Sequence, residues 1–495
     1  MAPHGNTGLR PALRLCATLR LCATLCLCPA ISTLHAASTA ADSPLAAVVD
    51  AAVVDAAAVD AAAVDAAAVD SVATEWLADT AAPSVSVAIV QHGALVYAKA
   101  YGLAVETPSR RATAATRYDL DSVSKEFTAT AILMLAEQGK LSLDEPLRNW
   151  FPNLGAAAAV TLRQLLTHTS GLRDYWPQDY VTPEMTKATT TTGIIDEWVQ
   201  RPLDFEPGTA WQYSNTGFVM AAAVVQRVSG EPLFAFLQHR VFTPLGMHQV
   251  REVTQAKAPE DAAGYTRYGV GPVHEAPKEA GGWLQGAAFL VMPPSDVARW
   301  DLSLLHRSLL RPASYQTQFA PMLLKNGNAT SYGLGLDIEQ VNGRLRIGHS
   351  GGGSGFLAEN RLWPNDDAAI VVLSNNDWAS PADLADRLAF LVLAPTPAEQ
   401  RVRAVFDALQ RGTLDRALFT DIGNAYLTQA VLADMQSGLA PLGPMRLLEL
   451  QHESRRGGLI NRRWKVLCAH ARLEVIERGE PGGKLEEFFV SKRED

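Results

Sequence analysis

Ser122 and Lys125 stand three positions apart at the start of residues 119–141, DLDSVSKEFTATAILMLAEQGKL, whose apolar spacing predicts a helix. Side chains at this spacing lie on one face of a helix, within reach of each other. A serine hydroxyl becomes a good nucleophile when a neighbour accepts its proton, and an amine does so only where burial or a helix N-terminus lowers its pKa. The pair fits a serine nucleophile with a lysine base. Taken alone, such a pair is more often a capping serine followed by a solvated lysine.

Two further motifs follow in the chain. WQYSNTGF, residues 211–218, holds the only Tyr-x-Asn, and IGHSGGG, residues 347–353, holds the only His-x-Gly. In this order, the three motifs resemble those of the penicillin-recognising serine hydrolases, in their class C β-lactamase branch. The first motif consists of Ser122 and Lys125, the second of Tyr213 and Asn215, and the third of His349, Ser350 and Gly351. The stretches FTATAILMLAEQGKLSLDEPL, LRQLLTHTSGL, FEPGTAWQYSNTGF and VFTPLGM are also similar to that family, and the similarity runs from about residue 75 to about residue 393.

The resemblance implies a role for each motif. Ser122 would attack a carbonyl carbon and become acylated, with Lys125 accepting its proton. The Tyr213 phenol would relay that proton to the leaving group and later help to activate water. Asn215 would hold Lys125 and the carbonyl side of the substrate. The backbone N–H groups of Ser122 and Gly352 would form the oxyanion hole.

The third motif is expected on a strand at the edge of the site, where His349, Ser350 and Gly351 would bind substrate. Gly351 would let the substrate approach the backbone closely. Many relatives have lysine at the position of His349, where it attracts a substrate carboxylate. Because histidine is mostly neutral at pH 7, this sequence does not predict strong recognition of a carboxylate or efficient hydrolysis of β-lactams.

A rival nucleophile lies within the same motif. Residues 348–352, GHSGG, fit the G-x-S-x-G elbow of α/β-hydrolases, which would make Ser350 the nucleophile. That elbow leads from a strand into a helix and is followed by an acid and then a histidine. Here strand-like runs follow, and the only later histidines, His452 and His470, come after the Pro-rich residues 395–397, so we favour Ser122.

Three other polar stretches have weaker claims to a function. His168, in LLTHTSGL, is expected to be a hydrogen-bonded structural residue of a turn rather than an additional base. Residues 173–176, RDYW, follow it and are candidates to line the mouth of the site. Residues 325–327, KNG, are expected to form a turn rather than a lysine motif that binds substrate.

The elements that would position these motifs indicate an α+β fold. SVSVAIVQHGALVYAKAYGLA, from Ser84, predicts a hairpin that turns at His92-Gly93. Residues 120–300 are mainly helical in period, and strands return at YGLGLDIEQ, GRLRIGHSG, GFLAENRLW and AAIVVLSN. We therefore expect an antiparallel sheet built from the N- and C-terminal segments of one domain, flanked by helices and carrying a large helical insertion. This is the β-lactamase/transpeptidase-like fold that the resemblance implies.

The chain divides into four expected parts. Residues 1–41 have the basic, apolar and small-residue layout of a signal peptide, with an uncleaved membrane anchor as the less favoured alternative. Residues 42–71 carry an Ala/Val/Asp repeat of five residues and are expected to be a spacer. The hydrolase domain would span residues 72–395, and residues 396–495 would form a small α+β accessory domain. The mature protein would be exported, to the periplasm or the medium.

Composition narrows the possible partners. The formal net charge is -9, and no run of basic residues alternates with aromatic ones, so a nucleic-acid or anionic-lipid partner is not expected. Four of the five cysteines precede residue 42, which leaves only Cys468 and allows no internal disulfide. No cluster has metal-ligand spacing and no Gly-rich loop is placed to bind phosphate, so we expect no metal or cofactor. The oligomeric state is left open.

Together these features predict a serine hydrolase that acts on a small molecule or peptide: a D-amino-acid peptide, a β-lactam or an ester. The alternative is a penicillin-binding sensor or scaffold with little or no turnover. Intact Ser122, Lys125 and Tyr213 argue against an inert scaffold.

Overall fold

The computed structural model describes residues 64–178 and 180–493. The expected signal peptide and the spacer up to residue 63 lie outside the described residues. No helix within the described ranges combines the length and apolar character needed to span a bilayer.

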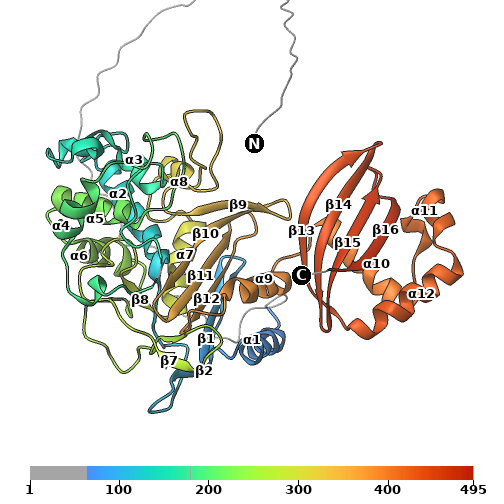
Figure 1. Cartoon of the computed structure of the whole chain (residues 1–495). Helices are drawn as coiled ribbons and strands as arrows, with labels where there is room; N and C mark the ends of the chain where they lie inside the picture. The colour runs from blue at the N-terminus through green and yellow to red at the C-terminus, as the bar shows by residue number, and fades with distance from the viewer. Residues whose placement is uncertain (1–63, 179, 494–495) are drawn as a thin grey trace, which may run out of the picture. The chain divides into compact units, whose positions relative to one another are not determined.

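The central element is a seven-stranded antiparallel sheet in the order β3-β2-β1-β12-β11-β10-β9. Val85 near the start of the domain pairs with Ser374 near its end, and Figure 1 shows blue β1 beside orange β12. The expectation of a sheet built from both ends of one domain is therefore confirmed. The strands are β1 (Ser84–Gln91), β2 (Ala94–Val105), β3 (Arg110–Arg111), β9 (Asp337–Val341), β10 (Arg344–Gly353), β11 (Phe356–Trp363) and β12 (Ala368–Ser374).

The turn between β1 and β2 has the backbone that its residues favour. His92 and Gly93 have positive φ angles of 51° and 68°, as the two central residues of a tight hairpin turn require. Residues 84–90 of β1 are all buried because helices cover both faces of the sheet. Val87 faces the core formed with α1 (Ala66–Thr80) and α9 (Pro381–Val392), while Ala88 faces the larger core that includes α7 (Pro294–Leu305).

Helix α1 begins within the last part of the Ala/Val/Asp repeat. Asp65 caps its N-terminus by accepting hydrogen bonds from two backbone N–H groups, and Val69 is completely buried. Asp70 forms an ion pair of 2.7 Å with Lys99 on β2. The last copy of the repeat thus belongs to the folded domain, and the boundary expected at residue 71 differs from the start of the helix at Ala66.

The insertion between β2 and β9 carries Ser122, the predicted nucleophile. Its helix α2 is buried along residues 124–135 and packs against α5, which begins at the second motif. The insertion is less purely helical than expected, because short strands form a three-stranded and a two-stranded sheet within it. Its helices besides α7 are α2 (Ser124–Glu137), α3 (Leu162–Leu166), α4 (Thr191–Ile194), α5 (Asn215–Ser229), α6 (Leu233–Leu237) and α8 (Pro312–Gln318), and its strands are β4 (Tyr118–Asp119), β5 (Arg251–Glu252), β6 (Tyr265–Arg267), β7 (Val273–Glu275) and β8 (Leu290–Met292).

The C-terminal residues form a second sheet with its own apolar core. The sheet order is β13-β14-β15-β16, and Trp464 and Phe406 are among the residues buried beneath it. A capping box of Thr396 and Glu399 starts the first helix. The elements are α10 (Pro397–Arg411), α11 (Asp421–Tyr426), α12 (Gln429–Leu439), β13 (Met445–Arg456), β14 (Leu459–Cys468), β15 (Ala471–Gly479) and β16 (Leu485–Lys492).

Candidate active site

Ser122 lies in a short 3-10 turn, Asp121–Val123, directly before α2. Its side chain makes no capping bond to the helix. Instead Ser122 Oγ accepts hydrogen bonds from Lys125 Nζ at 2.8 Å and from Tyr213 Oη at 2.7 Å. The first two motifs therefore meet at one oxygen atom, and the alternative of Ser122 as a helix cap is wrong.

The Lys125 side chain is completely buried and has two further acceptors. Its Nζ donates to Asn215 Oδ1 at 2.8 Å and to the Ala287 carbonyl at 3.0 Å. These two oxygens can only accept hydrogen bonds, so they fix the direction of two N–H bonds of the amine. The remaining position on the nitrogen points to Ser122 Oγ.

The orientation of the Asn215 amide is fixed by Asp174, a residue that follows the LLTHTSGL stretch. Asn215 Nδ2 donates to Asp174 Oδ2 at 3.1 Å, which leaves Oδ1 facing Lys125. The other carboxylate oxygen of Asp174 accepts from the Trp176 backbone N–H at 3.0 Å. Burial raises the pKa of Asp174, while these hydrogen bonds and Lys125 lower it in part. Asp174 is a positioning residue that the motifs do not reveal.

His168 supports Tyr213 from behind. It has a φ of 58° in a buried turn, and its Nδ1 accepts the Ser214 backbone N–H at 3.1 Å. Its ring centroid lies 4.2 Å from that of Tyr213. Burial lowers the pKa of His168 well below the ordinary value, so the ring is neutral. This geometry is that of the structural turn residue expected from the sequence.

The third motif forms the part of β10 that extends past β9 toward Ser122. A Cβ atom added at Gly351 would lie 2.2 Å from the carbonyl oxygen of Leu120, just before the nucleophile turn. Glycine is thus required for the close contact of β10 with that turn. Gly352 is exposed on the same strand and, with Ser122, lines one cavity.

His349 lies at this edge as a neutral side chain. Its Nδ1 is 2.5 Å from the Ser350 carbonyl, so Nδ1 carries the hydrogen, and its Nε2 is left to accept the Tyr332 hydroxyl at 2.7 Å. Burial, reinforced by the positive charge of Lys125, lowers the pKa of His349 to about 3. The ring therefore offers no positive charge to a substrate at neutral pH.

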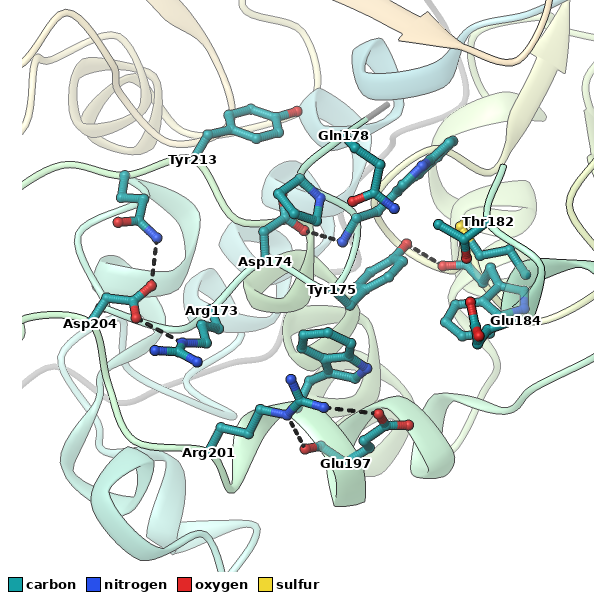
Figure 2. A pocket seen from close by; sticks show the side chains of 16 residues that line it. Arg173, Asp174, Tyr175, Gln178, Thr182, Glu184, Glu197, Arg201, Asp204 and Tyr213 are labelled. Atoms are coloured by element: carbon teal, nitrogen blue, oxygen red, sulfur yellow. Dashed lines mark hydrogen bonds and ion pairs between the residues drawn. The ribbon is translucent and has the colours of Figure 1, made fainter. Parts of the chain in front are cut away.

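Two cavities meet at Tyr213. The one that reaches Ser122 has a volume of about 490 Å³ and is lined by all three residues of the third motif and by Tyr332. The other, of about 900 Å³, is lined by residues 173–176, as expected for the mouth of the site, and by the Trp198 and Trp283 rings. Figure 2 shows Asp174 and Tyr175 in this larger cavity, with Tyr213 at its upper border.

The competing motifs have other structures. Ser350 lies within β10, which runs on to Gly353 and turns into β11 rather than into a helix, so the nucleophile elbow is wrong. Lys325 forms an ion pair of 2.6 Å with Glu206, and Gly327 has a φ of 84°, as in the expected turn. Within residues 64–178 and 180–493, no group of three or more His, Cys, Asp or Glu side chains is placed to hold a metal ion.

Comparisons with known proteins identify the family. The beta-lactamase family model matches residues 69–394. Penicillin-binding protein 4* of Bacillus subtilis (strain 168) is 30% identical over 308 residues, 59% of this chain and 68% of the relative. Esterase EstB of Burkholderia gladioli is 38% identical over 179 residues, 33% of this chain and 45% of the esterase.

A solved structure agrees in fold. The crystal structure of a D-stereospecific amidohydrolase from Streptomyces sp. matches with a TM-score of 0.59 at 24% identity, covering 67% of this chain and 100% of that one. At this identity the match shows the fold alone. With the family model matching most of the chain, these findings establish that the protein belongs to the beta-lactamase family of serine hydrolases.

Proposed function

We propose that this protein is an exported serine hydrolase that forms an acyl-enzyme at Ser122 and cleaves a peptide, amide or ester bond. The observation that carries the proposal is the convergence of Lys125 Nζ and Tyr213 Oη on Ser122 Oγ, at 2.8 and 2.7 Å. A nucleophile within hydrogen-bond reach of a base and an acid is the arrangement that acyl transfer requires. The penicillin-binding protein and esterase relatives support this class of reaction.

In the proposed acylation, Lys125 acts after losing a proton: two N–H bonds stay directed at the Asn215 and Ala287 oxygens, and its lone pair replaces the N–H bond to the Ser122 hydroxyl. Ser122 Oγ bonds to the carbonyl carbon as its proton passes to the amine. Tyr213 donates a proton to the leaving oxygen or nitrogen as that bond breaks. Backbone N–H groups of Ser122 and Gly352 would stabilise the oxyanion, a contribution typically worth about 3 to 4 kcal/mol per donor.

Water would then hydrolyse the ester on Ser122, with the proton transfers reversed. Tyr213 lines the cavity, and its oxygen, which has given a proton to the leaving group, is the proposed acceptor of the water proton. Turnover separates this function from that of a penicillin-binding sensor, which would stop at the acylated serine.

The test compares the wild type with Ser122→Ala on a fluorescent penicillin, a chromogenic cephalosporin, a D-Ala-D-Ala peptide and a short-chain aryl ester. We expect hydrolysis of at least one substrate and a covalent adduct on the peptide that contains Ser122, identified by mass spectrometry. Ser350→Ala is the informative second variant, because its adduct on Ser122 should persist. An active Ser122→Ala protein refutes the assignment, and an adduct without turnover of any substrate favours the sensor.

Export has its own measurement. We expect the secreted or periplasmic protein to start near Ala41, after loss of the basic and apolar segment. N-terminal sequencing of protein recovered from each fraction tests this, and an intact N-terminus in the membrane fraction would favour the anchor.

A further inference from the structure

The cavity of about 490 Å³ is lined by both Ser122 and Tyr213, the two residues that would act on the scissile bond. It contains both the nucleophile, Ser122, and the exposed strand residue Gly352, whereas the larger cavity contains neither. In the proposed function, on which this inference rests, Tyr213 gives its proton to the leaving atom. That atom must therefore lie beside Tyr213 and within reach of Ser122, and the smaller cavity is the one of the two that both residues line.

The charges on the wall of this cavity are negative. Its lining residues include the carboxyl groups of Asp337, Glu359 and Asp377, and none of them is a lysine or an arginine. His349, where relatives often present a lysine, is neutral. A carboxylate on the leaving group would thus enter a site that repels it, with no side chain of the wall to balance its charge.

The nearest arginines are already paired with other carboxylates. Arg361 Nε donates to Glu359 Oε1 at 2.6 Å, and Arg346 Nε donates to Glu339 Oε2 at 2.9 Å. Among the described residues, no Lys, Arg or His nitrogen lies within 4.0 Å of a carboxylate oxygen of Asp337. Asp377 also has no ion pair within the described ranges, but its carboxylate accepts hydrogen bonds from the Thr266 side chain and from the Gly355 backbone. Asp337, half-buried at the start of β9, has neither kind of partner among those residues and is therefore the wall carboxylate best placed to gain a cationic partner from a ligand.

The larger cavity supplies no alternative cation. Figure 2 shows its two arginines bound to carboxylates of the same wall: Arg173 to Asp204 at 2.8 Å and Arg201 to Glu197 at 3.0 Å. A substrate carboxylate on this side would have to compete with an existing ion pair.

The wall of the smaller cavity also presents aromatic rings. Trp211, Tyr213 and Tyr332 line it, and the Trp211 and Tyr332 ring centroids are 6.1 Å apart. Aromatic faces attract organic cations, most strongly where water is excluded. Rings and an unpaired carboxylate on one wall form the combination that binds an alkylammonium group.

From this arrangement we infer that the enzyme prefers esters or amides whose leaving group carries a positive charge and no carboxylate, and that Asp337 is the residue that selects the charge. Ser122 Oγ forms the bond to the acyl carbon, the bond to the leaving oxygen, sulfur or nitrogen breaks, and that atom takes the proton of Tyr213. The ammonium group is chemically unchanged and leaves with the product.

The test uses three thioesters with one acyl group and leaving thiols that differ in charge. The thiols are 2-(trimethylammonio)ethanethiol, its neutral isostere 3,3-dimethylbutanethiol, and 3-mercaptopropionate, each detected as the free thiol. We expect kcat/KM to be highest for the cationic thioester and lowest for the anionic one. Asp337→Asn should reduce the preference for the cationic over the neutral thioester about tenfold, as expected for one partly solvated charge pair. Asp383→Asn, which removes a carboxylate on α9 that does not line the cavity, should leave the preference unchanged.

Each result bears on a different step. Equal kcat/KM for the three thioesters overturns the inference and leaves the proposed function intact. A cationic preference that survives in Asp337→Asn overturns the role of Asp337. If no thioester is cleaved, calorimetric titration of Ser122→Ala with the cationic and neutral thioesters still measures the selectivity, and equal affinities refute it. If Asp337→Asn does not fold, inhibition of the wild type by ethyltrimethylammonium serves instead, and a lack of inhibition counts against the site.

Discussion

Two completely buried carboxyl groups lie close together in the core: Glu126 on α2 and Asp301 on α7. One amide bridges them: Asn360 Nδ2 is 3.2 Å from Glu126 Oε1 and 2.9 Å from Asp301 Oδ1. The two carboxylate oxygens are then at most roughly 6 Å apart, where two negative charges repel by roughly 3 kcal/mol at an effective dielectric constant of about 20. Burial raises the pKa of Glu126 to about 8 and that of Asp301 well above its ordinary value.

The raised pKa of the Glu126 carboxyl makes the stability of the folded protein depend on pH. Glu126 ionises near pH 4.5 in the unfolded chain but only near pH 8 in the folded protein. The Glu126 carboxyl makes its full contribution to stability below about pH 4.5. As the pH rises from there toward 8, the free energy of unfolding falls by about 1.4 kcal/mol per pH unit. Glu126→Gln cannot ionise and keeps an oxygen to accept the Trp300 Nε1 hydrogen, a bond of 2.6 Å in the wild type. Relative to this variant, the wild type should lose about 3.5 kcal/mol of unfolding free energy between pH 5 and pH 8.

Urea unfolding followed by tryptophan fluorescence at pH 5, 6, 7 and 8 measures this difference. Glu260→Gln is the control, because that carboxylate is exposed on the surface, and its curve should run parallel to that of the wild type. A gap between wild type and Glu126→Gln that stays constant with pH would mean that Glu126 is already ionised in the folded protein, and would refute the reasoning.

Three other outcomes are expected. Asp174→Ala releases the Asn215 amide, so kcat should fall about 10- to 100-fold, as expected for the loss of one hydrogen bond to a charged group, while stability to urea changes little. Steady-state kinetics test this, and an unchanged kcat contradicts it. Gly351→Ala places a methyl group against the Leu120 carbonyl, so it should lower stability by about 1 to 3 kcal/mol and abolish acylation. Thermal unfolding measures the stability and adduct formation measures the acylation; a stable, active variant refutes the contact. Burial, followed by the charges of Glu339 and Glu359, raises the pKa of Asp337 to about 7, while Arg346 opposes the shift. The preference for the cationic over the neutral thioester should therefore grow as the pH rises from 6 to 8 in the wild type, but not in Asp337→Asn.

Local pattern predicts much of the fold and brings the residues of the first two motifs together. The His92-Gly93 turn and the strands around it follow from residue preferences, and the order of the three motifs predicts the meeting of Ser122, Lys125 and Tyr213. These features depend on short stretches of sequence, where hydrophobic period and turn chemistry act directly.

Features that depend on distant contacts were missed. The role of Asp174 depends on Asn215, 41 residues later, and the only local signal was its place in a polar, aromatic stretch. The sequence does not predict the second half of β13, HESRR, because these residues are exposed and lack the alternation of a half-buried strand. The repeat likewise gives no local signal that Asp70 pairs with Lys99 on a separate strand.

The pairing of β1 with β12 has a consequence for biosynthesis. At about 5 to 20 residues per second, a ribosome needs roughly 15 to 60 s between synthesising Val85 and its partner Ser374. During that interval the apolar edge of β1 has no neighbour, and the nascent domain cannot complete its sheet. A chain that stops before Ala368 should therefore aggregate rather than fold, however complete its catalytic helix α2 is.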